Sequence, residues 1–217
     1  MKVFRNLEIA ADPQRLGEFV ELVLHGLRDP WSLARDKAQE SLARDFRPTA
    51  RWCARRAWNG PFSAVLLWLR QMDENRVEVT NIVPDAASGQ LSLDEYNTIV
   101  EEFYRAYVAP LAVQQSVAAS LSKSEETLED WMSPQTATLL RRYLSLANLS
   151  SPLAHPNDEQ RWEDFIVAAH NEQSSLDGHT LRRWLCEDQR LPDVIAMELV
   201  SKYEFGRSLL SRALIAV

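Results

Sequence analysis

Apolar residues in the first half of the chain change between strand-like and helical spacing. Residues 2–9 have a period of two, which predicts a strand, and Asp12-Pro13 then opens a helix over residues 13–27. Residues 31–46 indicate a weaker helix or a helical loop. Short turns separate three apolar or alternating segments, which predict an antiparallel meander of strands at residues 51–58, 62–71 and 76–83.

Helical spacing dominates the second half. Ser92 and Glu95 fit a capping box, and apolar residues at helical spacing extend this helix to about Pro110. Residues 114–127 are polar and small, as is typical of a linker. Beyond them, helices are predicted to begin at Ser133-Pro134, at Asn157 as the N-cap, near Leu181 and at Leu191-Pro192-Asp193.

These patterns predict an α+β protein, in which an antiparallel sheet flanked by helices is followed by an all-helical C-terminal unit. At about 150 residues per domain, a chain of 217 residues suits one large domain or two small ones. The change of period favours two. We place an α+β domain at residues 1–112, a linker at residues 113–130 and a helical domain at residues 131–217.

Charge and composition restrict the classes of partner that the chain is expected to bind. The chain has 24 Lys and Arg against 31 Asp and Glu, a net charge of −7, so it repels nucleic-acid phosphates and anionic membrane surfaces. Its longest apolar stretch, residues 64–69, is far shorter than the roughly 18 residues of a membrane span. Cys53 and Cys186 form no CxxC pair, which predicts reduced thiols in a cytoplasmic protein. We expect neither a nucleic acid nor a membrane as partner.

Histidines are the main candidates for residues of a catalytic or metal site. His155 and His170 could assemble such a site with Asp158 or Glu163, although the spacings typical of zinc helices are absent. Hydrogen bonding in loops and at helix ends is the favoured role for these histidines. Only six glycines occur, and none forms a phosphate-binding loop, so no cofactor is expected.

Two strand faces carry residues that would matter if exposed. Trp52, Arg56 and Trp58 have the same parity, so an exposed face would resemble a protein-binding hot spot. The favoured interpretation is that the helix over residues 13–27 covers this face. Asn81 interrupts an apolar strand and points either into a pocket or to the strand edge before Pro84, with the edge favoured.

Several short motifs carry a resemblance to a known family. They are Asn81-Ile82-Val83-Pro84, Leu91-Ser92 with Asp94-Glu95-Tyr96-Asn97, Leu146-Ala147-Asn148, His155-Pro156 with Asp158, Arg161-Trp162, Phe165-Ile166, Ala168-Ala169-His170 and Tyr203-Glu204-Phe205. On these the chain resembles a family of uncharacterised bacterial proteins, over most of residues 1–210. The resemblance implies a bacterial cytoplasmic protein and no particular activity.

Within the matched segments, one grouping is the first candidate for a site: His155, Arg161, Trp162 and His170. Trp162 and His170 share a helix face, because residues 162, 166 and 170 are spaced by four. A helix that starts at residue 157 is also expected to bring His155 and His170 together.

Three functions are compatible with these features. The first is a non-catalytic protein that acts through protein–protein interaction, in the manner of an immunity or antitoxin protein, with a partner whose identity the sequence does not give. The second is a hydrolase or metal-dependent enzyme that uses His155 and His170. The third is a regulatory domain that binds a small ligand on the sheet. The sequence predicts no oligomeric state.

Overall fold

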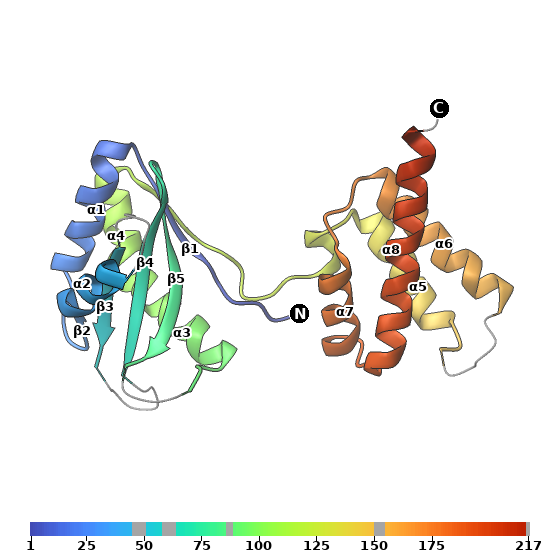
Figure 1. The fold of residues 1–217 in the computed structure, drawn as a ribbon, viewed down its shortest axis with the longest axis horizontal. Helices are drawn as coiled ribbons and strands as arrows, with labels where there is room; N and C mark the ends of the chain where they lie inside the picture. The colour runs from blue at the N-terminus through green and yellow to red at the C-terminus, as the bar shows by residue number, and fades with distance from the viewer. Residues whose placement is uncertain (45–50, 58–63, 86–88, 150–154, 216–217) are drawn as a thin grey trace. The chain divides into compact units, whose positions relative to one another are not determined.

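The computed structural model describes residues 1–44, 51–57, 64–85, 89–149 and 155–215 (Figure 1). The chain forms two compact units, one of Lys2–Ser124 and one of Glu125–Val217 together with Met1. The first contains a six-stranded antiparallel sheet with helices, and the second is helical. The predicted α+β class is therefore confirmed.

The sheet of the first unit has the order β2-β3-β4-β5-β1-β6, and every neighbouring pair is antiparallel. The predicted meander is confirmed, since β3, β4 and β5 are consecutive neighbours. Two short strands, β2 and β6, were not predicted, and the first strand begins five residues later than expected. The strands are β1 (Leu7–Ala10), β2 (Trp31–Leu33), β3 (Arg51–Arg56), β4 (Val65–Asp73), β5 (Arg76–Pro84) and β6 (Ala118–Leu121).

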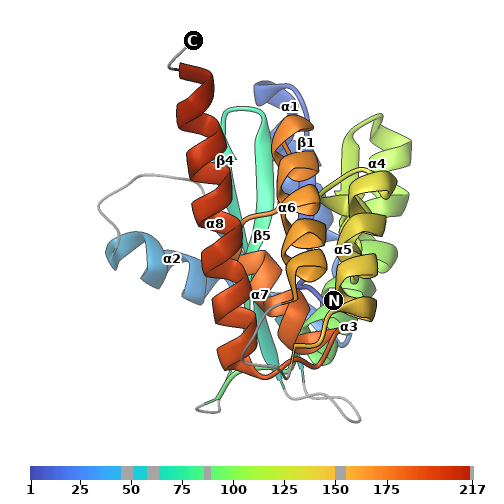
Figure 2. The same cartoon turned by 90° about the vertical axis from the view of Figure 1, so that its right-hand side faces the viewer.

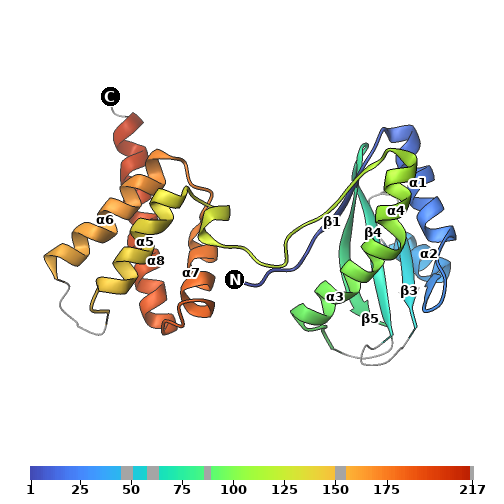
Figure 3. The same cartoon turned by 180° about the vertical axis from the view of Figure 1, so that it is seen from behind.

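Helices cover one face of this sheet, and Figure 3 shows α3 (Leu93–Phe103) and α4 (Ala109–Gln115) crossing it. Alternate strand residues such as Ile9 and Leu67 form a buried core there with α3 and α1 (Pro13–His25). The opposite face carries a smaller cluster, in which Ala38 of α2 (Arg35–Arg44) packs against Cys53 and Leu66. Much of β4 and β5 is open on this face.

The helix predicted to end near Pro110 continues to Gln115 through a π-helical turn, η1 (Tyr104–Val108). Pro110 has no N–H, and in an α-helix its ring would clash with the carbonyl four residues earlier. In the wider turn, the Ala109 N–H donates to the Tyr104 carbonyl, five residues back. Strand β6 follows and pairs with β1. Residues 113–130, predicted as a linker, therefore include a strand of the sheet.

Asn97 attaches the segment before β1 to α3. The Arg5 N–H donates to Asn97 Oδ1, and Asn97 Nδ2 donates to the Val3 carbonyl, both at 2.8 Å. The Asn97 side chain is buried. These bonds hold residues 3–5 against α3, and β1 begins only at Leu7.

Replacing Asn97 by alanine is expected to lower the free energy of unfolding of this unit by about 2 kcal/mol. The change leaves a backbone donor and a backbone acceptor without their partner, and each such loss costs about 1–3 kcal/mol when buried. Urea unfolding followed by circular dichroism measures the difference. Asn6→Ala is the matched control, because Asn6 is exposed and its side chain has no described partner. Equal stabilities of the two variants would contradict this role of Asn97.

The second unit contains four α-helices among its described residues: α5 (Pro134–Leu146), α6 (Pro156–Asn171), α7 (Gly178–Glu187) and α8 (Asp193–Ile215). A short 3-10 helix, η2 (Leu128–Asp130), precedes them. Figure 2 shows α6 between α5 and α8. A row of aromatic rings joins the three helices, with centroid distances of 4.8 Å from Tyr143 to Trp162, 5.2 Å from Trp162 to Phe165 and 5.6 Å from Phe165 to Tyr203.

Local capping residues set the helix starts. Ser133 caps α5, as predicted, and its Oγ accepts from the Thr136 N–H. The prediction that Asn157 caps α6 is wrong. His155 is the N-cap, and its Nδ1 accepts from the Asn157 N–H at 3.2 Å. Pro156 takes the first helical position, where its missing N–H costs nothing.

Candidate functional site

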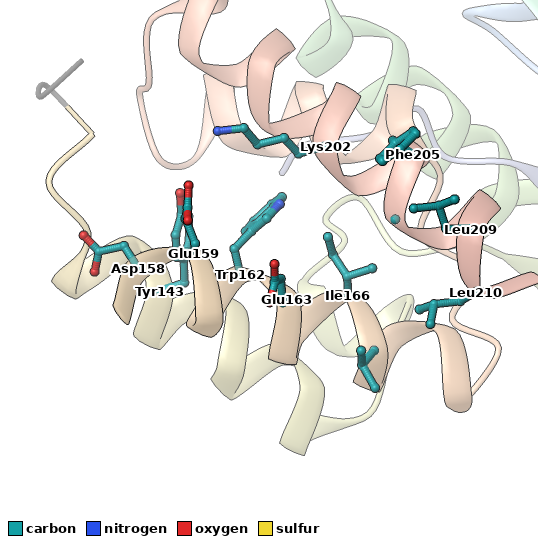
Figure 4. Close-up of a pocket in the computed structure, with 12 residues that line it drawn as sticks. Tyr143, Asp158, Glu159, Trp162, Glu163, Ile166, Lys202, Phe205, Leu209 and Leu210 are labelled. Atoms are coloured by element: carbon teal, nitrogen blue, oxygen red, sulfur yellow. The ribbon is translucent and has the colours of Figure 1, made fainter. Parts of the chain in front are cut away.

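A groove of about 510 Å³ lies between α6 and the second half of α8, with one residue from α5 (Figure 4). All of its lining belongs to the helical unit. The lining residues are Tyr143, Asp158, Glu159, Trp162, Glu163, Ile166, Val167, Lys202, Phe205, Gly206, Leu209 and Leu210.

Trp162 forms part of the groove wall, and one polar atom of its side chain has no hydrogen-bond partner among the described residues. Its side chain is only 4% exposed, and the ring extends from α6 toward α8 (Figure 4). The indole Nε1 is buried and has no hydrogen-bond partner among the described residues. Buried donors are nearly always paired, so this indole N–H is an exception in the wall of the groove.

The α8 side of the groove is unusually apolar for a surface. Phe205 is 67% exposed and Leu209 is 50% exposed, and their spacing of four puts them on one helix face. Val167 of α6 is also exposed beside them. Clustered large apolar side chains of this kind mark surfaces that bind another molecule.

The α6 rim is acidic. Glu159 and Glu163 are exposed, and neither carboxylate has an ion-pair partner among the described residues. Nearby charges are already paired, Asp158 with Arg161 at 2.6 Å and Lys202 with Glu198 at 2.8 Å. Residues 125–217 hold nine Lys and Arg against fifteen Asp and Glu, so this unit carries −6 of the net charge of −7.

Tyr143 contributes a neutral hydroxyl. Burial, together with the negative charge of Asp158, raises the pKa of Tyr143 to about 12. The phenol therefore keeps its proton at neutral pH and adds no charge to the groove.

A glycine sets how closely α8 approaches α6 at the groove. A Cβ atom on Gly206 would lie 2.9 Å from Cγ2 of Ile166, which is closer than real Cβ atoms approach a neighbour. The absence of a side chain at position 206 thus allows the close packing beside Phe205.

Gly206→Ala is expected to lower the free energy of unfolding by about 1–3 kcal/mol, because the added methyl overpacks against Ile166. In an Ile166→Ala background the same substitution is expected to stabilise by about 1 kcal/mol, because alanine favours a helix over glycine. Urea unfolding of the four proteins in this cycle measures both effects. An equal cost in both backgrounds would show that Ile166 does not cause the strain.

The structure separates the residues that the sequence grouped. Trp162 lines the groove, and Arg161 pairs with Asp158 at its rim. His155 caps α6, whereas His170 lies in its last turn. At about 1.5 Å per residue they are about 22 Å apart along the axis, so the expectation that this helix brings them together is wrong. The described residues contain no group of three or more His, Cys, Asp or Glu side chains that could hold a metal ion.

The strand residues have different surroundings. Trp52 packs on the core of the first unit, and its Nε1 donates to Glu21 of α1 at 2.8 Å. Arg56 is buried and paired with Glu102. Trp58 lies outside the described residues. Asn81 is exposed and lines a second cavity, on the open face of the sheet.

Sequence reasoning missed most of the groove. Phe205 entered the sequence analysis only through a motif, and Glu159 and Gly206 did not enter it. The usable signal was the pair Phe205 and Leu209 at a spacing of four, next to Glu159 and Glu163 at the same spacing on another helix.

Comparison with protein-family models, with curated proteins and with solved structures found no match to this chain. The family resemblance drawn from short motifs stays a prediction. Over the part of the chain that the structure describes, no helix combines the length and apolar character needed to cross a membrane. The fold defines an α+β chain with a helical unit.

Proposed function

We propose that this chain is a non-catalytic binding protein, and that the α6–α8 groove binds a helical segment of a partner protein. The partner segment carries large apolar side chains on one face and Lys or Arg beside them. The observation that carries the proposal is the exposed apolar pair Phe205 and Leu209 next to the carboxylates of Glu159 and Glu163, which have no ion-pair partner among the described residues.

The shape of the groove supports a helical occupant. Amphipathic helices bind in grooves between helices by inserting apolar side chains spaced by three or four residues. A groove of about 510 Å³ is large enough to receive such side chains.

The charge distribution supports a basic partner. Opposite charges at the rim of an interface steer encounter and reject acidic competitors. The helical unit carries six of the seven net negative charges, so it attracts a basic surface from a distance. An acidic protein that covers a basic effector would act in the manner of an immunity or antitoxin protein. That is the biological role for which this chain is suited.

Nuclear magnetic resonance of the ¹⁵N-labelled full chain tests the groove directly. The probe is a designed helical peptide with leucine on one face and flanking lysines. The Trp162 indole N–H resonance, assigned by its loss in Trp162→Phe, is expected to shift on titration. A peptide with the same leucines and flanking glutamates is expected to bind at least about tenfold more weakly.

Two variants on α8 provide a matched comparison. Phe205→Asp is expected to abolish binding of the lysine peptide, whereas Val194→Asp is expected to preserve it, because Val194 is exposed on the same helix outside the groove. A proteome-wide capture with these two variants and the wild type then identifies a natural partner as one lost only with Phe205→Asp. Equal binding of both peptides, or equal loss in both variants, would overturn the proposal.

A further inference from the structure

A second cavity, of about 270 Å³, lies on the open face of the sheet in the other unit. Strands β3, β4 and β5 supply its lining, and no residue of the α6–α8 groove contributes. The lining residues are Arg51, Trp68, Leu69, Arg70, Thr80 and Asn81.

A β-bulge brings two polar side chains to this cavity. Trp68 pairs with Asn81, but the next residue, Leu69, pairs with Val79, so Thr80 is an extra residue in β5. A bulge bends its strand and redirects the side chains beside it, and bulges occur often next to active sites. Thr80 and Asn81 are both exposed in consequence, and both line the cavity beside Trp68.

Two arginines face each other across the same cavity. Arg51 of β3 and Arg70 of β4 are directly opposite in the antiparallel register. Both side chains carry a positive charge, so this part of the sheet attracts an anion. The Arg70 Nε is buried and has no hydrogen-bond partner among the described residues. The cavity thus has two arginines in its lining, and among the described residues the Nε of Arg70 is left without an acceptor.

The nearest acidic side chain in the register is engaged elsewhere. Glu78 of β5 lies opposite Arg70, but it forms an ion pair with Arg76, at 3.4 Å. Arg76 also lies 3.7 Å from Glu8 and 3.3 Å from Asp73. Arg76 is therefore surrounded by carboxylates, whereas Arg70 has no ion pair among the described residues.

We propose that this cavity binds the carboxylate or phosphate group of a small aromatic molecule. The planar guanidinium of Arg70 donates to the oxyanion, because arginine matches carboxylate and phosphate geometry. The Thr80 hydroxyl and the Asn81 amide donate to the same group. The Trp68 ring contacts the aromatic body of the ligand. This site would make the sheet unit a sensor of an anionic metabolite, separate from the protein-binding groove.

Isothermal titration calorimetry of the full chain at low ionic strength tests the site with four probes. Phenyl phosphate and phenylacetate represent the two oxyanions, inorganic phosphate lacks the aromatic body, and benzyl alcohol lacks the charge. One of the two aromatic anions is expected to bind at least about tenfold more tightly than inorganic phosphate and benzyl alcohol. The tighter of the two identifies the oxyanion.

Arg70→Gln is expected to weaken binding of the aromatic anion by about tenfold or more, since it removes the charged donor. Arg76→Gln is the matched control, because Arg76 lies on the same sheet outside the cavity, and is expected to change binding less than twofold. Asn81→Ala, on an exposed side chain, provides a second test with little risk to folding. Absence of binding by both aromatic anions, or equal binding by wild type and Arg70→Gln, would overturn the proposal.

Discussion

Replacement of Glu102 by leucine is expected to lower the free energy of unfolding of the α+β unit by about 3 kcal/mol or more. The Glu102 carboxylate accepts from Arg56 Nε and Nη2, each at 3.1 Å, and from Trp31 Nε1 at 2.7 Å. Arg56 is only 4% exposed. Leucine would leave the Trp31 donor unpaired and remove the carboxylate that neutralises a buried guanidinium.

Two further variants separate charge from hydrogen bonding. Glu102→Gln retains an acceptor for Trp31 and loses the charge. Its free energy of unfolding is therefore expected to lie between those of the wild type and Glu102→Leu. Glu21→Ala is the matched control, because Glu21 also accepts from a tryptophan indole, that of Trp52, but is exposed. It is expected to cost less than about 1 kcal/mol. Urea unfolding compares all four proteins, and a loss below 1 kcal/mol for Glu102→Leu would contradict the structural role of this pair.

The strongest local signals in the sequence correspond to the best-predicted parts of the fold. The capping box at Ser92 has both of its bonds, with the Glu95 N–H donating to Ser92 Oγ at 3.2 Å and the Ser92 N–H donating to Glu95 Oε2 at 2.9 Å. Strand β5 alternates because only one face of the sheet lies on the main core, and Val77 and Val79 point there. Such signals depend on few residues and are therefore readable from the sequence.

The two short strands lack such a signal. β2 has three residues and β6 has four, which is too few to establish a period. Trp31 lies in β2 because Arg56 of the neighbouring strand pairs with it, a contact between residues far apart in sequence. Before β6, Ser116 ends α4 in the left-handed conformation, at φ 52°, where glycine would usually mark the break. Their placement depends on tertiary pairing.

Of the residues that line the groove, the sequence pattern indicated Trp162 as a site residue but did not indicate the others. Trp162 stood out through its position on a helix face. Phe205 did not, because α8 is apolar on more than one face, with Leu199 and Tyr203 in the core and Phe205 and Leu209 exposed. A sequence pattern alone does not say which of these faces the neighbouring helices cover. Glu159 and Glu163 form the rim of a groove only because α6 packs against α8, which the sequence pattern does not show.

Phe165→Ala is expected to lower the free energy of unfolding of the helical unit by about 3–5 kcal/mol. The sheet unit is expected to keep its stability. Phe165 is fully buried, and its ring stacks on Tyr203 with an interplanar angle of 18°. Alanine would leave a cavity in the row of aromatic rings that joins α5, α6 and α8. Trp162, which packs on the same ring at 5.2 Å, would lose the support that holds it in the groove.

Hydrogen exchange distinguishes this local effect from a general one. Amides of α6 and α8 are expected to exchange faster in Phe165→Ala, whereas those of β4 and β5 are expected to keep their wild-type rates, because the ring of Phe165 packs on Trp162 and Tyr203 of the helical unit. Phe165→Leu, which retains much of the side-chain volume, is expected to cost less than half as much. Equal acceleration in both units would show that the chain unfolds as one cooperative body, and it would tie any ligand on the sheet to the stability of the groove.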